Sequence, residues 1–387
     1  MSYYILPRIN NKIEINDIKI TTGNNNPVIS KSLFFYLNLL KKQIDNYIVN
    51  WDIYKKYTNP YEYIHTIIPY TKQSICKLKP LSRSFYKLIE ICNLLNLLDD
   101  FDNNPIKTFH LAEGPGGFIE AINLLRNNSS DTYYGMTLIN NNNDIIPGWK
   151  KSKYYLSKHK NIIIEYGDDN TGDLFNVKNL WYCYYKYNNS MDIITGDGGF
   201  DFSVDFNKQE IMANKLIFSQ ICFAIAMQKK GGIFILKIFD VFTQATIDIL
   251  YILSCLYEKV YIVKPNTSRF ANSERYLVCK NFNLDNTYKV INHLSTLFTQ
   301  LTSDNKIERF LDKNIHYIYV NKIEDINAIM GQQQLENILS TLYLIDNNKQ
   351  DKLENIKKNN IQKCIQWCIK NKLPYNKNIQ QLNVFLD

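Results

Sequence analysis

Residues 106–122 read IKTFHLAEGPGGFIEAI, and this stretch decides the fold class. It begins as a short apolar strand, breaks at the Gly-Pro-Gly-Gly turn of 114–117, and continues with apolar residues at helical spacing. Strand, glycine turn and helix in this order form ligand cradles in doubly wound sheets, because glycine allows close backbone approach and the helix N-terminus presents N–H groups. An ordinary loop is the alternative interpretation. The spacing is neither Gly-x-Gly-x-x-Gly nor followed by Lys-Ser/Thr, so it does not favour a dinucleotide site or a P-loop.

Strand and helix patterns alternate after this turn, which is typical of a mostly parallel sheet covered by helices on both faces. The later predicted strands are residues 132–138, 161–165, 191–195, 233–238, 260–263 and 276–279, and the long predicted helices are 208–228 and 243–256. The connection between the last two strands is too short for a helical crossover, so these strands should pair antiparallel. We therefore predict an α/β fold with a seven-stranded, mostly parallel sheet and an antiparallel last strand.

The regions on either side of the predicted sheet contain other patterns. Residues 1–70 are poor in glycine and include an amphipathic helix pattern at 30–48, and a second such pattern covers 82–98. Beyond about residue 285 glycine nearly vanishes and helical patterns dominate, most clearly at 352–370. We predict an N-terminal extension (1–70), a central domain (71–284) and a helical C-terminal region (285–387).

The composition is that of an ordinary globular protein. The 387 residues are 45% hydrophobic and 21% charged, and the net charge of +8 is compatible with a polyanionic partner. The eight cysteines form no C-x-x-C pair and lie away from the five histidines, so we expect neither a zinc site nor a disulfide framework. The first residues lack a signal-peptide pattern and no apolar run approaches about 18 residues, so we expect a soluble protein in a reducing compartment.

Four charged residues lie where such a sheet presents side chains to a cleft. Asp197 ends the fourth strand and Lys237 ends the next. Glu274 precedes the last strand, and Lys87 lies on the helix before the glycine turn. Taken separately, they have an equally good alternative interpretation, in which Lys237 and Asp197 form a structural ion pair and Lys87 and Glu274 are solvated charges. Taken together, two lysines and two carboxylates in one cleft suit the activation of a weak nucleophile, provided that burial or a neighbouring cation lowers the pKa of one lysine.

Seven short motifs occur in order along the chain. They are 82–91 (SRSFYKLIEI), 114–118 (GPGGF), 171–173 (TGD), 197–200 (DGGF), 236–240 (LKIFD), 264–269 (KPNTSR) and 272–276 (NSERY). Together they resemble the FtsJ-type RNA ribose 2′-O-methyltransferases, and more narrowly the eukaryotic and large-DNA-virus enzymes that methylate the first transcribed nucleotide of capped mRNA. The resemblance covers about residues 80–282 and implies a Rossmann-like S-adenosylmethionine-dependent methyltransferase fold.

The resemblance also implies roles for individual residues. The family carries a Lys-Asp-Lys-Glu tetrad, which matches Lys87, Asp197, Lys237 and Glu274, and Lys237 would be the base that takes the proton of the ribose 2′-OH. Cofactor contacts are implied for Glu113, Gly114, Pro115, Gly116, Gly117, Phe118, Gly135, Asp173 and Asp197. RNA contacts are implied for Arg83, Lys264, Ser268, Arg269 and Asn272, with Lys208 as a further candidate.

One position departs from the commonest pattern of this family. Many members have an acidic residue at the end of the first strand, where this chain has His110. The resemblance therefore implies that Glu113 contacts the methionine amine of S-adenosylmethionine. His110 itself has two interpretations, a residue that contacts the ligand or a buried histidine whose hydrogen bonds are satisfied within the protein, and the second is at least as good as the first. Asp173 matches the acid that faces the adenine end, although Asp168 and Asp169 lie close to it in sequence.

The resemblance implies an mRNA (nucleoside-2′-O-)-methyltransferase that forms cap 1 and needs no metal. A 2′-O-methyltransferase of ribosomal or transfer RNA is one alternative, and a catalytically silent RNA-binding capping subunit is another. Capped mRNA is the expected partner, with other capping enzymes or RNA polymerase as further candidates. We expect a monomer that binds no membrane. The A/T-leaning codon composition that the Asn and Ile content suggests favours a cytoplasmic viral enzyme, whereas a cellular enzyme would work in the nucleus.

Overall fold

An eight-stranded sheet forms the centre of the computed structural model, which describes residues 2–9, 13–139, 148–199, 208–301, 306–347 and 349–377. Its strands are β1 (Ser2–Ile5), β8 (Tyr257–Lys264), β9 (Arg275–Phe282), β7 (Gln228–Ile238), β6 (Met191–Gly196), β3 (Lys107–Leu111), β4 (Thr132–Met136) and β5 (Ile162–Glu165), given in their order across the sheet. From β7 to β5 all neighbours are parallel. β9 runs antiparallel to β7 and β8, and β1 runs antiparallel to β8.

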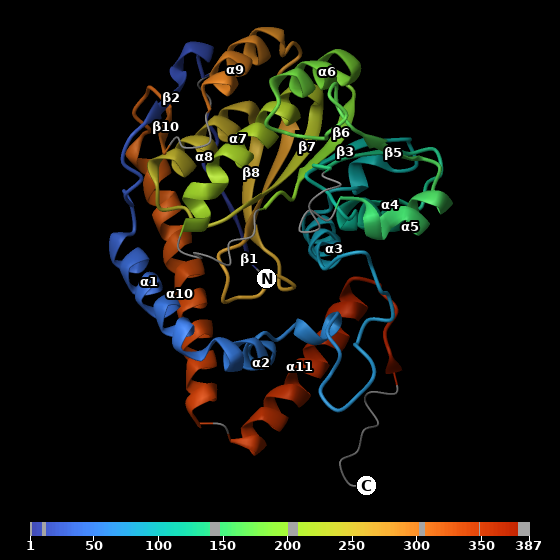
Figure 1. Ribbon diagram of the computed structural model, residues 1–387, viewed down its shortest axis with the longest axis vertical. Coiled ribbons are helices and arrows are strands. Elements are labelled where there is room, and N and C mark those ends of the chain that lie inside the picture. The colour runs from blue at the N-terminus through green and yellow to red at the C-terminus, as the bar shows by residue number, and fades with distance from the viewer. Residues whose placement is uncertain are drawn as a thin grey trace.

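Two groups of helices cover the two faces of this sheet (Figure 1). One face is covered by α6 (Val177–Tyr187), α7 (Gln209–Met227), α8 (Gln244–Leu256) and α9 (Tyr288–Gln300). The other is covered by α3 (Ser84–Leu95), α4 (Gly117–Arg126) and the short α5 (Lys153–Lys158). Alternate residues of the central strands enter the two cores. In β6, for example, Ile193 packs in one and Ile194 in the other, as expected for a sheet buried on both faces.

Four further helices form a frame beside the sheet (Figure 1). They are α1 (Lys31–Ile44), α2 (Ile48–Thr58), α10 (Tyr317–Asn347) and α11 (Gln350–Lys370). α10 contacts both α1 and α2, and α11 contacts α2 and the short helix η3 (Glu62–Ile64). The predicted N-terminal extension and C-terminal region therefore pack against each other.

The predicted α/β architecture is confirmed, including the antiparallel pairing of β8 and β9. The count of seven strands was too low, because β1 from the predicted N-terminal extension pairs with β8 and covers the edge of the sheet. The predicted C-terminal helical region also contains a strand, β10 (Ile307–Leu311), which pairs antiparallel with β2 (Ile18–Thr22) in a separate two-stranded sheet. The three predicted regions are thus interleaved, and their boundaries stay predictions.

Helix α7 corrects the prediction that no apolar segment approaches membrane-spanning length. Among the described residues it is the one helix long and apolar enough to cross a membrane, but 83% of that window is buried inside the protein. Burial on this scale is that of a core helix, which explains why the apolar residues of α7 are not confined to one face. Two other sequence interpretations, Phe200 in the motif at 197–200 and the polar loop at 140–143, lie outside the described residues.

Candidate active site

The glycine turn joins β3 to α4 at the carboxyl edge of the sheet. Gly116 has φ +110°, a conformation that favours glycine over any residue with a side chain. The carboxylate of Glu113 accepts hydrogen bonds from the N–H groups of Phe118 (2.6 Å) and Ile119 (3.2 Å). The chain itself therefore caps the N-terminus of α4. At these two N–H groups, the expectation of donors free for an anionic ligand is wrong.

Glu113 is buried close to Asp197. Burial, with a second contribution from the Asp197 carboxylate, raises the pKa of Glu113 well above its ordinary value. The indole N–H of Trp149 lies buried on the other side of the turn with no acceptor among the described residues. The same ring covers Gly135, where an added Cβ would lie 2.7 Å from Trp149 Cη2. Gly135 therefore serves close packing against Trp149, and a cofactor contact there stays a prediction.

The four predicted catalytic residues form two ion pairs. Lys237 Nζ lies 3.3 Å from Asp197 Oδ1 and donates to the Asp197 backbone carbonyl at 2.7 Å. Lys87 Nζ lies 2.7 Å from Glu274 Oε1. Each of the four side chains is 13–14% exposed, so both pairs are largely withdrawn from water but reachable from it.

The second ion pair is electrostatically linked to the first. Burial acts to raise the pKa of Glu274, but the ammonium groups of Lys87 and Lys237 outweigh it and hold the pKa well below its ordinary value. The linking strand is β9, where Tyr276 lies opposite Lys237 in the register. The Tyr276 hydroxyl donates to Asp197 Oδ1 at 2.9 Å. The structure therefore brings the tetrad together as the sequence predicted.

Tyr276 is a site residue that the sequence analysis missed. Its side chain is fully buried, and burial together with the Asp197 carboxylate raises its pKa well above the ordinary value. The phenol therefore keeps its proton and donates a hydrogen bond to Asp197. The available signal was its position, since Tyr276 ends the motif at 272–276 that also contains Glu274.

The loop from β8 to β9 is held rigidly around Glu274. The buried carboxylate of Glu90 on α3 accepts hydrogen bonds from the N–H groups of Asn266 (2.9 Å) and Thr267 (3.0 Å) and from the Thr267 hydroxyl. The Ser268 hydroxyl donates to Glu274 Oε1 at 2.8 Å. Lys264, which is 7% exposed, donates to the Glu274 carbonyl at 2.8 Å, and burial lowers its pKa to about 7.

These contacts do not fit RNA-binding roles for Lys264 and Ser268. A buried ammonium with its donors on backbone carbonyls cannot also reach a phosphate, and the Ser268 hydroxyl already orients Glu274. Asn272 is exposed, and its amide oxygen accepts from Lys264 Nζ at 3.2 Å.

The two predicted arginines differ from each other. Arg269 makes a bidentate ion pair with Glu62 of η3, with Nε 3.0 Å from Oε2 and the second nitrogen 2.6 Å from Oε1. The Glu62 side chain is fully buried. Arg83 has one long contact of 3.5 Å to the Thr267 carbonyl, and its Nε is buried without a partner among the described residues. Arg83 thus has donor capacity to spare, whereas the guanidinium of Arg269 is engaged within the protein.

The three aspartates of the acidic loop after β5 lie in different environments. Burial acts to raise the pKa of Asp169, but hydrogen bonds from Thr171, Asn176 and Asn179 together outweigh it and lower the pKa to about 2. Asp168 is exposed. Asp173 is half-buried and accepts from the Phe175 N–H at 2.8 Å. Asp169 is therefore a loop-stabilising acid, and the role of Asp173 toward adenine stays a prediction.

His110 is a buried core residue. Its Nε2 lies 2.8 Å from the Thr108 hydroxyl and its Nδ1 2.8 Å from the Thr195 hydroxyl, so both ring nitrogens are satisfied. Burial lowers the pKa of His110 to about 3. The structure thus supports the interpretation of His110 as a neutral histidine that joins β3 to β6.

The pH dependence of stability should report this burial. The folded-state pKa of about 3 lies below the unfolded value near 6.5, so unfolding takes up a proton and stability is lost as the pH falls from 6.5 towards 3. We expect His110→Gln to remove about 1.4 kcal/mol per pH unit of this slope. Urea unfolding at several pH values between 4.5 and 7 measures it, with His316→Gln at an exposed histidine as control. Equal slopes in wild type and His110→Gln would contradict a neutral buried His110.

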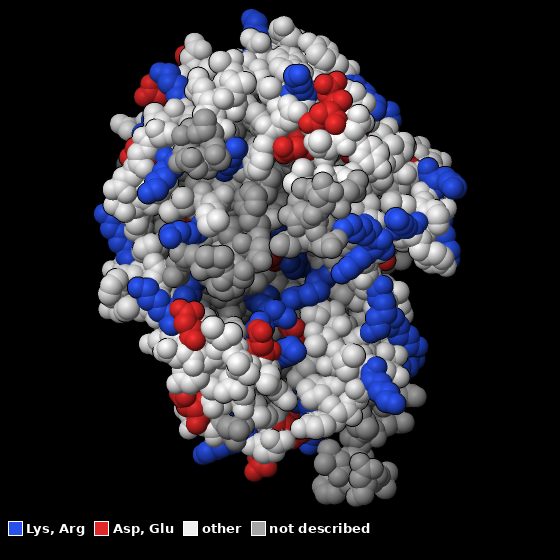
Figure 2. Space-filling model, in the orientation of Figure 1, with Lys and Arg blue, Asp and Glu red and all other residues white. Residues whose placement is uncertain are grey.

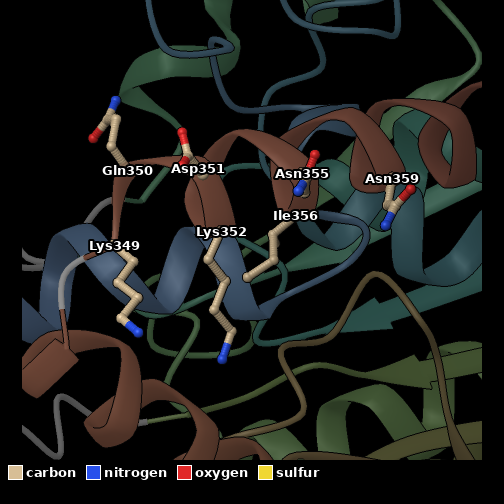
Figure 3. A pocket seen from close by; sticks show the side chains of 7 residues that line it. All are labelled: Lys349, Gln350, Asp351, Lys352, Asn355, Ile356 and Asn359. Atoms are coloured by element: carbon tan, nitrogen blue, oxygen red, sulfur yellow. The ribbon is translucent and has the colours of Figure 1, made fainter.

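A hollow along the first turns of α11 contains no residue of the glycine turn or of the tetrad (Figure 3). It is lined by Lys349, Gln350, Asp351, Lys352, Asn355, Ile356 and Asn359. All seven come from one stretch of chain and none is a predicted site residue, so no polar groups from different elements converge there.

Comparison with known proteins identifies one family. The family model described as FtsJ-like methyltransferase matches residues 80–282, which is more than half of the chain. This span contains the glycine turn, the four residues of the tetrad and the loop from β8 to β9.

Three curated relatives have similar sequences. Cap-specific mRNA (nucleoside-2′-O-)-methyltransferase 1 of Mus musculus is 31% identical over 235 residues, covering 57% of this chain and 27% of the relative. The enzyme of the same name from Trypanosoma cruzi is 40% identical over 119 residues, covering 30% and 33%. Cap-specific mRNA (nucleoside-2′-O-)-methyltransferase 2 of Drosophila melanogaster is 25% identical over 273 residues, covering 64% and 36%. The chain thus spans about a third of the length of these eukaryotic relatives.

Proposed function

Because the chain belongs to the FtsJ-like methyltransferase family, we propose that it methylates the ribose 2′-OH of the first transcribed nucleotide of capped mRNA. The observation that carries the proposal is the pairing of Lys237 with Asp197 and of Lys87 with Glu274 at the carboxyl edge of the sheet. The names of the curated relatives support capped mRNA as the substrate.

The residues beside the glycine turn fit S-adenosylmethionine as the methyl donor. Burial raises the pKa of Glu113 and the Asp197 carboxylate raises it further, so a cationic group near both carboxylates would offset their repulsion. S-adenosylmethionine carries a sulfonium and an ammonium group. When bound, it supplies an electrophilic methyl group. Glu113 would hold its amine, with Gly114, Pro115, Gly116, Gly117 and Phe118 around it and Asp173 toward the adenine.

The four residues of the tetrad have different roles in the methyl transfer. In its uncharged amine form, Lys237 Nζ takes the proton of the ribose 2′-OH as that oxygen bonds to the methyl carbon, and the bond from this carbon to sulfur breaks, leaving S-adenosylhomocysteine. Asp197, fixed by the Tyr276 hydroxyl, holds Lys237 in place through its carboxylate and its backbone carbonyl. Lys87 and Ser268 orient the Glu274 carboxylate, which lies close enough to Lys237 to stabilise its charge after proton uptake. Alignment is worth on the order of 7–11 kcal/mol in favourable cases, and a positioned base adds about 10²- to 10⁴-fold.

Capped and uncapped transcripts separate this proposal from its rivals. With labelled S-adenosylmethionine, we expect transfer to a capped RNA and at least about tenfold less to the same RNA lacking its cap. Equal transfer to both, or transfer only to ribosomal or transfer RNA, would favour the structured-RNA alternative. Transfer to no RNA would favour a silent RNA-binding subunit. The cytoplasmic location, viral origin, monomeric state and further capping partners stay predictions, and the relatives named above are eukaryotic.

A further inference from the structure

Two lysine-rich segments on the α4–α5 side of the molecule contain no acidic residue. They are residues 72–79 and 150–160, and neither contains an arginine. Their lysines are Lys72, Lys77, Lys79, Lys150, Lys151, Lys153, Lys158 and Lys160. All eight are exposed.

These eight positive charges equal the net charge of the whole chain. The protein has 45 Lys and Arg against 37 Asp and Glu, a difference of +8, so all the remaining charges of the sequence cancel. Within the two segments no acidic residue offsets these eight charges. A field of one sign on one surface attracts a polyanion, which an evenly spread excess would not do.

The two segments come together in space. Lys79 lines the same hollow as Lys158, His159 and Lys160, and Asn123 on α4 lies in its lining with its amide directed at the Tyr155 hydroxyl at 2.7 Å. Figure 2 shows Lys and Arg side chains gathered in the hollow at the middle of the molecule and continuing to its right-hand edge. The eight lysines defined above are called the lysine surface.

The lysine surface adjoins the active site at the glycine turn. The short helix η5 (Lys150–Ser152) begins the second segment, and its Ser152 hydroxyl donates to the Pro115 carbonyl within that turn. On the first segment's side, the Leu81 N–H, two residues beyond Lys79, donates to Glu120 of α4 at 2.7 Å. A chain leaving the glycine turn along η5 would meet these lysines, and Glu120 is the one acidic residue in the lining of the hollow.

We propose that the lysine surface binds the phosphates of the substrate RNA beyond the methylated nucleotide, an inference that rests on the proposed function. Lysine is a mobile point charge that suits phosphate oxygens, and the absence of arginine means that no bidentate base reading is built in. On the 5′ side of the methylated nucleotide, the only phosphates are those of the bridge to the cap. Eight lysines can neutralise more phosphates than this bridge contains, so they match the longer RNA backbone on the 3′ side. The surface therefore supplies affinity that grows with RNA length and does not depend on sequence.

A triple variant tests this surface in the full-length protein. Lys151→Gln, Lys153→Gln and Lys158→Gln together should raise KM for a capped RNA of about 20 nucleotides on the order of tenfold and leave kcat unchanged. KM for a capped RNA of about three nucleotides should stay the same. The slope of log Kd against log salt for the longer RNA should become shallower by about 2, because about 0.7 counterions are released per phosphate in single strands.

A matched control separates position from charge. Lys178→Gln, Lys259→Gln and Lys289→Gln change the charge equally at exposed lysines elsewhere and should leave both KM values unchanged. An equal loss in both triple variants, or no length dependence, would overturn the proposal. Poly-glutamate competing as well as RNA would reassign the surface to an acidic protein. Binding of uncapped RNA, measured by fluorescence anisotropy, still tests the surface if the wild type transfers no methyl group, so failure of the proposed function is distinguishable.

Discussion

Lys237→Ala should lower kcat for methyl transfer by about 10²- to 10⁴-fold, the contribution of a positioned general base. Binding of S-adenosylmethionine should persist, because the glycine turn, Glu113 and the Tyr276–Asp197 hydrogen bond do not depend on the lysine. Single-turnover transfer gives the rate, and calorimetric titration with S-adenosylmethionine gives the affinity.

The matched control for Lys237 is Lys259→Ala, at an exposed lysine on β8, which β9 separates from β7. It should transfer methyl groups at the wild-type rate. If Lys237→Ala retained a rate within about tenfold of wild type, Lys237 would not be the base.

Glu62→Gln should destabilise the protein by about 3–5 kcal/mol, the usual cost of breaking a buried ion pair from one side. Burial acts to raise the pKa of Glu62, but the bidentate contact with Arg269 outweighs it and holds the pKa well below its ordinary value. Asn59 and Thr66 also donate to this carboxylate, so the neutral amide leaves several donors without their acceptor. The free energy of unfolding in urea measures the effect.

Two comparisons make the Glu62 result specific. Glu258→Gln breaks an exposed ion pair with Arg8, at 3.8 Å, and should leave the free energy of unfolding nearly unchanged. The double variant Glu62→Gln/Arg269→Gln should be less destabilised than the sum of the single variants, because no buried charge is left unpaired. A loss for Glu62→Gln as small as for Glu258→Gln would contradict the buried pair.

The sheet and the tetrad were predictable because their signals are local. Apolar runs locate the central strands, and residues at strand ends such as Asp197 and Lys237 must meet at the carboxyl edge of parallel strands. The strands β1, β2 and β10 were not predicted. Each is short, and each pairs with a strand far away in sequence, so no hairpin or crossover pattern marks it.

The internal partners of the predicted RNA-contact residues could not be read from the sequence, because they lie on segments far away along the chain. Arg269 looks like a phosphate ligand in the sequence, and only the fold brings Glu62 to it from 207 residues away. Lys264 and Ser268 likewise turn inward toward Glu274. For His110, the Thr108 hydroxyl two residues earlier was a readable signal, whereas the Thr195 hydroxyl needed the pairing of β3 with β6.

Mapping the methyl group on a short capped transcript shows directly which atom of the RNA the protein methylates. The RNA is incubated with the protein and S-adenosylmethionine, digested to nucleosides and cap dinucleotides, and analysed by mass spectrometry, with Lys237→Ala in parallel. We expect one added methyl group on the ribose of the first transcribed nucleotide, formed at least about 10²-fold more slowly with Lys237→Ala. A methyl group on a base, on an internal ribose or equally on both proteins' products would contradict this expectation.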